Sequence, residues 1–168
     1  SRNLTPDHLA RHHTMELYAA AKGRILENQL PDDTVILNAD DPWCVAYAAQ
    51  SKGKVIWFST RRSVTHGLWL EAGNILLDGT TLMPAADVPV RGLHNLANTM
   101  AAAAAALSAG AKPEAIAEAV RTFPGVEHRL EQVARIDEVD YVNDSKATNV
   151  DATLKALESF SGNLWVIL

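Results

Sequence analysis

The chain has 168 residues, enough for one sizeable domain or for one domain with part of another. Hydrophobic residues make up 48% and charged residues 21%, which provides for a packed core and excludes a disordered chain. The net charge of −5, without a basic stripe, argues against nucleic acid as the main partner, and the single cysteine, Cys44, excludes a disulfide framework.

No segment has the character of a membrane span. The longest unbroken apolar run, 100–107, is too short and too rich in alanine to cross a bilayer. No signal peptide is visible. A lone cysteine also suits a reducing compartment, so we expect a cytoplasmic protein.

The first third of the chain alternates helical and strand patterns. A strand, a helix and a second strand in this order predict a parallel pair with a right-handed crossover. The expected elements are a helix start at Thr5-Pro6, a helix over 15–29 capped by Thr14, a strand over 34–37, a helix from about 42 to 53 capped by Asp40 or Asp41, and a strand over 55–59.

Between 61 and 90 the pattern changes to short apolar segments. They are separated by Gly73-Asn74, Asp78-Gly79 and Pro84, which are typical hairpin signals. We therefore expect a small antiparallel sheet in this region. The fold class that follows is α/β, with a mostly parallel sheet, flanking helices and a small antiparallel sheet.

The rest of the chain predicts helices, one hairpin and a last strand. The run 164–168 has the composition of a buried strand, and a strand in that place suggests a piece of a longer protein. The expected elements are helices over 95–109 and 113–122, a hairpin of strands over 130–136 and 139–142, a helix over 150–160 and a strand at 164–168.

A polar loop at 143–149 separates the second strand of that hairpin from the helix. Asn143-Asp144-Ser145-Lys146-Ala147-Thr148-Asn149 combines an acid, a base and several hydroxyl or amide groups. A helix start offers free backbone N–H groups and a partial positive charge. Such a loop suits a phosphate or a carboxylate.

Lys22 is the second candidate. In a continuous helix it would share an apolar face with Tyr18, Ala21, Ile25 and Leu26. A lysine in an apolar stripe must extend its amine to water, pair with an acid or lose its proton. A neutral amine can form a carbamate with carbon dioxide, and the carbamate oxygens can bind hard metal ions. The alternative is a lysine at the edge of the stripe with its amine in water.

Other polar residues also have two interpretations. His8 could be a metal ligand, or a surface residue in a first helical turn. His94, Asn95 and Asn98 lie at the start of the alanine-rich helix, where a cap explains one polar group but not three. His128-Arg129 could be a functional pair or an ordinary surface pair.

Together these motifs resemble a known family. The resemblance covers nearly the whole chain in the family's order, and the 143–149 motif resembles the members that add D-glutamate. The family is that of the Mur ligases, and the matching segments are Arg11-His12-His13, Tyr18 to Lys22, Asn38-Ala39-Asp40-Asp41, His94-Asn95, His128-Arg129 and the loop 143–149.

The resemblance implies an ATP-dependent amide ligase of cytoplasmic peptidoglycan precursor synthesis. Such an enzyme would activate UDP-N-acetylmuramoyl-L-alanine as an acyl phosphate and join it to D-glutamate. It also implies Mg²⁺ as a cofactor and a monomer as the functional form. Positioning and cations would supply most of the catalysis, because negative charge is shed at phosphate oxygens.

The family's functional residues match particular positions of this chain. Lys22 resembles a carbamylated lysine that helps to hold magnesium, and His8 resembles the histidine ligand of that metal. Lys22 and Lys146 are thereby implied as catalytic residues. The other implied roles are adenine recognition for His94, Asn95 and Asn98, ribose and phosphate binding for Arg129 and Asp144, contact with the transferred phosphoryl group for Lys146 and contact with D-glutamate for Thr148.

Two departures limit what this chain can do by itself. Ala10 stands where the family usually has an acidic residue, and no G-x-x-x-x-G-K-[ST] phosphate loop is present. We therefore assign 1–160 to the latter part of a central ATP-binding domain and 161–168 to the first strand of a following domain. The chain alone is expected to be inactive. The alternatives are a non-catalytic nucleotide-binding or interaction module, and a related ligase for another amino acid.

Overall fold

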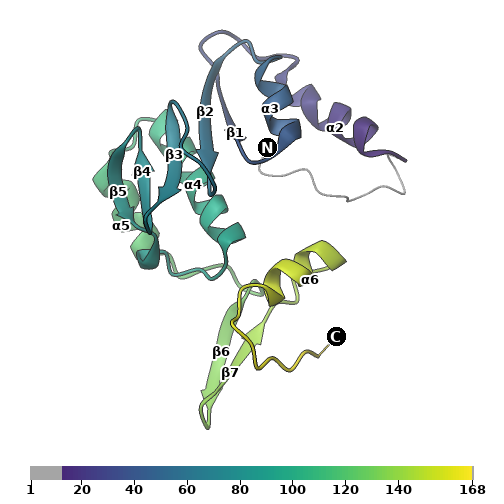
Figure 1. Cartoon of the computed structure of the whole chain (residues 1–168), viewed down its shortest axis with the longest axis vertical. Helices are drawn as coiled ribbons and strands as arrows, with labels where there is room; N and C mark the ends of the chain where they lie inside the picture. Colours follow the sequence, from purple (N-terminus) through teal and green to yellow (C-terminus); the bar gives the residue numbers. More distant parts are fainter. Residues whose placement is uncertain (1–12, 168) are drawn as a thin grey trace.

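A five-stranded mixed sheet is the centre of the computed structural model, which describes residues 13–167 (Figure 1). The order of the strands in space is the order in the chain, and β1, β2 and β3 pair in parallel. The pairs β3–β4 and β4–β5 are antiparallel. The strands are β1 (Thr34–Asn38), β2 (Lys54–Ser59), β3 (Gly67–Glu71), β4 (Asn74–Leu77) and β5 (Thr80–Pro84).

The α/β class is confirmed, but the antiparallel strands expected between 61 and 90 are not a separate sheet. They extend the parallel pair, because β3 joins the free edge of β2 with Phe58 opposite Leu68. The sheet is therefore mixed rather than mostly parallel. The separate antiparallel sheet is the hairpin of β6 (Glu131–Ile136) and β7 (Val139–Asn143), where the sequence predicts two strands.

Helices cover both faces of the sheet and bury two clusters of apolar side chains. Successive strand residues point to opposite faces, so Ile36 packs with one cluster and Leu37 with the other. The first cluster lies under α4 (Leu93–Ser108) and α5 (Pro113–Arg121) and contains Phe58 and Met100. The second lies under α2 (Met15–Gly23) and α3 (Pro42–Ala48).

Local signals set the starts of these helices as expected. The hydroxyl of Thr14 accepts from the backbone N–H of Leu17 at 3.2 Å, and the Asp41 carboxylate accepts from Trp43 at 2.8 Å. The ends differ from expectation. The helix at 15–29 stops at Gly23 and continues as a 3-10 turn, Arg24–Leu26, while α3 stops at Ala48. The helix start at Thr5-Pro6 lies outside the described residues.

The prediction of a single apolar face for the 15–29 helix is wrong. Tyr18 and Leu26 are buried, but Ala21 and Ile25 are exposed. A long-range contact sets this orientation, because a Cβ on Gly23 would lie 3.0 Å from the Tyr47 ring of α3. That close approach turns the Ala21 side of the helix to solvent.

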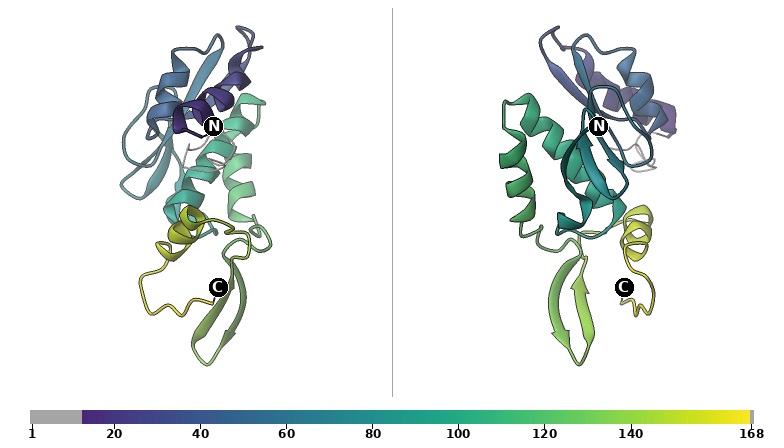
Figure 2. Two further views of the ribbon diagram at one scale, coloured as in Figure 1. Left: turned by 90° about the vertical axis from the view of Figure 1, so that its right-hand side faces the viewer. Right: turned by 60° about the vertical axis from the view of Figure 1, so that its left-hand side comes forward.

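The hairpin β6–β7 and α6 (Val150–Leu157) lie at one end of the molecule, away from α2 and α3 (Figures 1 and 2). The turn of the hairpin is the expected Asp137-Glu138 pair, with φ values of 47° and 65°. The strand expected at 164–168 does not form over 164–167, where Trp165 is 98% exposed. A strand needs a neighbour, and no described strand pairs with this segment. No described helix could cross a membrane.

Candidate functional site

The polar loop at 143–149 connects β7 to α6, as the sequence predicts. The side chain of Asn149 caps α6 by accepting from the backbone N–H of Ala152 at 2.9 Å. Asn143, the last residue of β7, accepts from the backbone N–H of Ser145 at 3.1 Å. These local hydrogen bonds fix both ends of the loop, while Lys146 and Thr148 between them are exposed.

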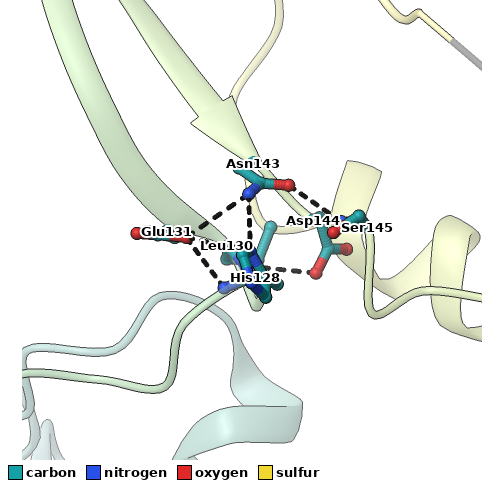
Figure 3. Close-up of polar contacts among 6 residues, drawn as sticks. All are labelled: His128, Leu130, Glu131, Asn143, Asp144 and Ser145. Carbon is teal, nitrogen blue, oxygen red and sulfur yellow. Dashed lines mark hydrogen bonds and ion pairs between the residues drawn. The ribbon is translucent and has the colours of Figure 1, made fainter.

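Long-range hydrogen bonds tie the loop to the segment 128–131 (Figure 3). Asp144 Oδ1 accepts from the backbone N–H of Leu130 at 3.1 Å, and the backbone N–H of Lys146 donates to the His128 carbonyl at 3.0 Å. Asn143 Nδ2 lies 2.9 Å from His128 Nδ1, which accepts this bond in the neutral tautomer that carries its proton on Nε2. The residues on both sides of Arg129 are therefore hydrogen-bonded to the loop.

Glu131 adds to these hydrogen bonds and was not singled out from the sequence. Its Oε2 accepts from the backbone N–H of His128 at 2.8 Å and lies 3.4 Å from Asn143 Nδ2. The signal that could have found it is its place opposite Asn143 in the hairpin register. Glu131 thus connects the two segments that carry Arg129 and Asp144.

The start of α4 contributes a buried amide. Asn95 is only 5% exposed, and its Nδ2 donates to the Arg91 carbonyl at 2.7 Å. Its Oδ1 accepts from Asn98 Nδ2 at 3.3 Å. The cap of α4 comes from Gly92, whose φ of 94° favours glycine, and involves no side chain. The cluster at 94–98 is therefore not a cap. The Asn95 amide is bonded within the chain, whereas Asn98 is partly exposed.

Asn95, Asn98 and Arg129 line one pocket of about 470 Å³. Apolar side chains form most of its remaining wall, including Ile116, Val120 and Phe123 from the α5 side of the cleft. The lining residues on α4 recur at spacings of three and four from Asn95 through Thr99 to Ala106, so they lie on one helical face. A flat, mostly apolar group with hydrogen-bonding edges fits such a lining.

His94 is half-buried beside this pocket, next to the charges of the loop region. Burial lowers the pKa of His94 below its usual value of 6.5, and the nearby Lys155 adds to the lowering. The carboxylate of Asp144 acts in the opposite direction, and Arg129 again favours the neutral form. His94, Arg129 and Asp144 are thus electrostatic neighbours although they come from three separate segments.

Lys22 does not belong to this group of residues. It is exposed on α2, with Nζ 5.4 Å from the centre of the Tyr18 ring. The helix α2 lies apart from the hairpin β6–β7 and α6, so Lys22 and Lys146 come from separate parts of the molecule (Figure 1). The alternative interpretation, a lysine with its amine in water, describes this placement.

A magnesium site is not assembled by the described residues. No group of three His, Cys, Asp or Glu side chains among residues 13–167 is placed to hold a metal ion. His8, the other predicted ligand, lies outside the described residues. An ammonium group has no lone pair to offer a cation, so Lys22 in its ordinary form is not a ligand.

Known proteins resemble this chain along its whole length. The Mur ligase middle domain family matches residues 2–106. The UDP-N-acetylmuramoylalanine–D-glutamate ligase of Solibacter usitatus is 55% identical over 99% of this chain, and that of Koribacter versatilis is 50% identical over 99%. The chain spans 38% of the length of each of these relatives.

Solved structures share the fold. MurF from Acinetobacter baumannii superimposes with a TM-score of 0.76 at 19% identity, over 94% of this chain and 36% of that one. At that identity the likeness concerns the fold alone.

Proposed function

The chain belongs to the Mur ligase family, and we propose that it is the nucleotide-binding segment of a ligase that adds D-glutamate to UDP-N-acetylmuramoyl-L-alanine. The observation that carries the proposal is the 55% identity to a D-glutamate ligase over 99% of the chain. ATP would supply the phosphoryl group that activates the muramoyl-alanine carboxylate. Residues 161–168 would lead into a following domain.

The pocket beside α4 is the proposed site for the base of ATP. Adenine has two flat apolar faces and an edge of donors and acceptors. The apolar walls from α5 suit the faces, and the amides of Asn95 and Asn98 suit the edge. Asn95 is fixed through Arg91, so Asn98, which is partly exposed, would make the direct hydrogen bond.

The loop region would bind the rest of the nucleotide. Arg129 lines the pocket and carries the positive charge that a phosphate needs, while the Asp144 carboxylate can accept hydrogen bonds from ribose hydroxyls. Asp144 Oδ1 already accepts from Leu130, and a carboxylate has further lone pairs to offer. A half-buried neutral His94 would leave the positive charge next to the nucleotide to Arg129.

Lys146 and Thr148 are exposed on the loop, where a second substrate can reach them. We assign Lys146 to the transferred phosphoryl group and Thr148 to D-glutamate. Lys22 and His8 would bind magnesium only if Lys22 is carbamylated and if residues other than those described supply further ligands. A monomer and a cytoplasmic location are part of the same proposal.

A chimaera tests the ligase function directly. This chain would replace the matching segment of the full-length Solibacter usitatus ligase, and phosphate release would be measured with ATP and UDP-N-acetylmuramoyl-L-alanine. We expect release that depends on D-glutamate and not on L-lysine or diaminopimelate. The control is the same chimaera with Lys146→Ala, which should fold equally well but release little phosphate.

The alternatives give different results. A chimaera that folds and binds ATP without releasing phosphate would indicate a non-catalytic nucleotide-binding module. Release with L-lysine or diaminopimelate would indicate a related ligase for another amino acid. The isolated chain should release no phosphate, because the sequence has no phosphate loop to hold the β- and γ-phosphates.

A further inference from the structure

Arg91 lies just before α4 and contacts two distant parts of the chain. Its guanidinium Cζ is 5.6 Å from the centre of the Phe160 ring, which follows α6. Its Nη2 is 3.7 Å from Asp140 Oδ2 on β7. One side chain therefore joins the entry to α4, the hairpin and the end of α6, and neither Arg91 nor Phe160 lines the pocket at Asn95.

The backbone at Arg91 controls the buried amide. The Arg91 carbonyl accepts from Asn95 Nδ2 at 2.7 Å, which leaves Asn95 Oδ1 facing Asn98. A rotated Asn95 would lose both hydrogen bonds in a buried position, which is costly. The orientation of the Asn95–Asn98 pair therefore depends on where the Arg91 carbonyl lies.

Close packing next to Arg91 reinforces the connection. Gly92 has a φ of 94°, and a Cβ at this position would collide with Ser159 Oγ. The end of α6 thus rests directly on the two residues that lead into α4, and all three views place α6 beside that end of α4 (Figures 1 and 2). A displacement of α6 would have to move the Arg91–Gly92 backbone.

We propose that Arg91 is a positioning residue for the nucleotide pocket, which ties the hairpin β6–β7 and the end of α6 to the orientation of Asn95. This role rests on the proposed function, in which Asn95 and Asn98 form the site for the base of ATP. The C-terminal part of the chain carries the loop 143–149. Through Arg91, which lies outside the pocket, it would set the affinity of the pocket for the base of ATP. Phe160 and Asp140 both contact the guanidinium.

The test compares variants that keep or remove each contact. Arg91→Ala removes both, Arg91→Lys keeps a charge for Asp140 but loses the flat group that stacks on Phe160, and Phe160→Leu removes the ring. Phe160→Tyr keeps the ring. The matched control is Arg121→Ala, which removes an exposed ion pair with Asp87. The side chain of Arg121 is 43% exposed, and that of Arg91 is 46% exposed.

Two measurements separate this inference from the proposed function. ATP affinity of the chimaera with the Solibacter usitatus ligase is measured by calorimetry, and the side-chain amide resonances of Asn95 in the 168-residue chain are measured by NMR without nucleotide. We expect Arg91→Ala and Phe160→Leu to weaken ATP binding about fivefold or more and to shift the Asn95 resonances. Arg91→Lys should show an intermediate shift, whereas Phe160→Tyr and Arg121→Ala should leave both measurements unchanged.

Unchanged Asn95 resonances and affinity in Arg91→Ala would overturn the positioning role. Effects of equal size in Arg121→Ala would overturn it as well, because a general loss of stability would then explain them. Shifted Asn95 resonances, together with a chimaera that folds but binds no ATP, would support the positioning role and contradict the nucleotide site.

Discussion

Between Tyr18 and Ala117, two clusters of buried side chains fill both faces of the sheet, whereas after Ala117 only Ala156 is buried among the described residues. The hairpin β6–β7 is instead joined to the sheet unit by polar contacts such as the ion pair of Arg91 with Asp140, and hydrogen bonds such as that of Leu130 with Asp144 hold the C-terminal part together. Apolar packing is stable but insensitive to direction, while hydrogen bonds are directional and weaker. The sheet unit is therefore a rigid base, and the C-terminal part is an attachment whose position polar residues determine.

The candidate site lies where these two regions meet. Asn95 and Asn98 come from the packed region, while Arg129 and Asp144 come from the attached one. A site divided in this way can change when the attachment moves, because only a few contacts resist the movement. The difference between the regions can be tested by paired substitutions, one in each region.

The largest expected effect is a loss of stability when a buried aromatic residue of the sheet unit is replaced by alanine, compared with the same replacement on the hairpin. Phe58→Ala, at 1% exposure in the first cluster, should lower the free energy of unfolding by about 3–5 kcal/mol. Tyr141→Ala on β7, at 49% exposure, should cost roughly 0.5 kcal/mol or less. Urea denaturation followed by circular dichroism measures both. Equal losses would show that the hairpin is part of the same cooperative core.

Local signals predicted the packed region well. Thr14 and Asp41 cap their helices and the strands at 34–38 and 54–59 pair in parallel, because each depends on a few neighbouring residues or on alternation along one strand. The joining of β3 to β2 was missed, because the hairpin signals between 61 and 90 show that strands form there but not which edge they pair with.

The site was less predictable for the same reason. The face of α2 that carries Lys22 depends on the approach of Gly23 to Tyr47, which no helical periodicity contains. Asn95, Asn98 and Arg129 share a pocket because α5 and the segment after it fold back on α4. Family resemblance pointed to these residues, while spacing alone showed only that the polar groups at 94–98 exceed what a cap needs.

Two substitutions of Asp144 separate its hydrogen bond with Leu130 from its negative charge. Asp144→Asn keeps an oxygen that accepts from Leu130 but loses the negative charge, whereas Asp144→Ala loses both. We expect both variants to bind ATP about tenfold more weakly, since hydrogen bonds of charged groups contribute about 1.5–3 kcal/mol. Calorimetric titration measures the affinity.

Hydrogen exchange at the Leu130 amide provides the control for Asp144. Protection should persist in Asp144→Asn and fall in Asp144→Ala. Full ATP affinity in Asp144→Asn would mean that this carboxylate serves only to hold the loop.

The pH dependence of stability tests whether His94 is buried where the two regions meet. Burial, followed by the charge of Lys155, lowers its pKa in the folded protein below the unfolded value of 6.5. The unfolded state then binds more protons, so the stability contributed by neutral His94 is complete above about pH 6.5 and is lost as the pH falls below that value through the lower pKa of the folded state. His94→Gln should remove this part of the pH dependence, and Lys155→Gln should reduce it.

Urea midpoints of the three proteins between about pH 5 and pH 8 measure that effect. His13→Gln is the control, since His13 is exposed. A wild-type profile that coincides with that of His94→Gln would show that the attachment does not bury this imidazole in solution.

The smallest expected effect concerns two helix caps, one in each region. Thr14 accepts from Leu17 at 3.2 Å and Asn149 accepts from Ala152 at 2.9 Å, so replacement of either by alanine should weaken its helix by about 1 kcal/mol. In Thr14→Ala the loss should appear in the urea midpoint, because α2 buries Tyr18 and Ala19 in the second cluster. In Asn149→Ala it should appear mainly as faster hydrogen exchange in the first turn of α6, because that helix buries only Ala156 and can fray without unfolding the sheet. If Asn149→Ala lowers the urea midpoint as much as Thr14→Ala does, then α6 unfolds together with the sheet, and the contacts of Phe160 and Ser159 with the entry to α4 couple the two regions more strongly than their exposure indicates.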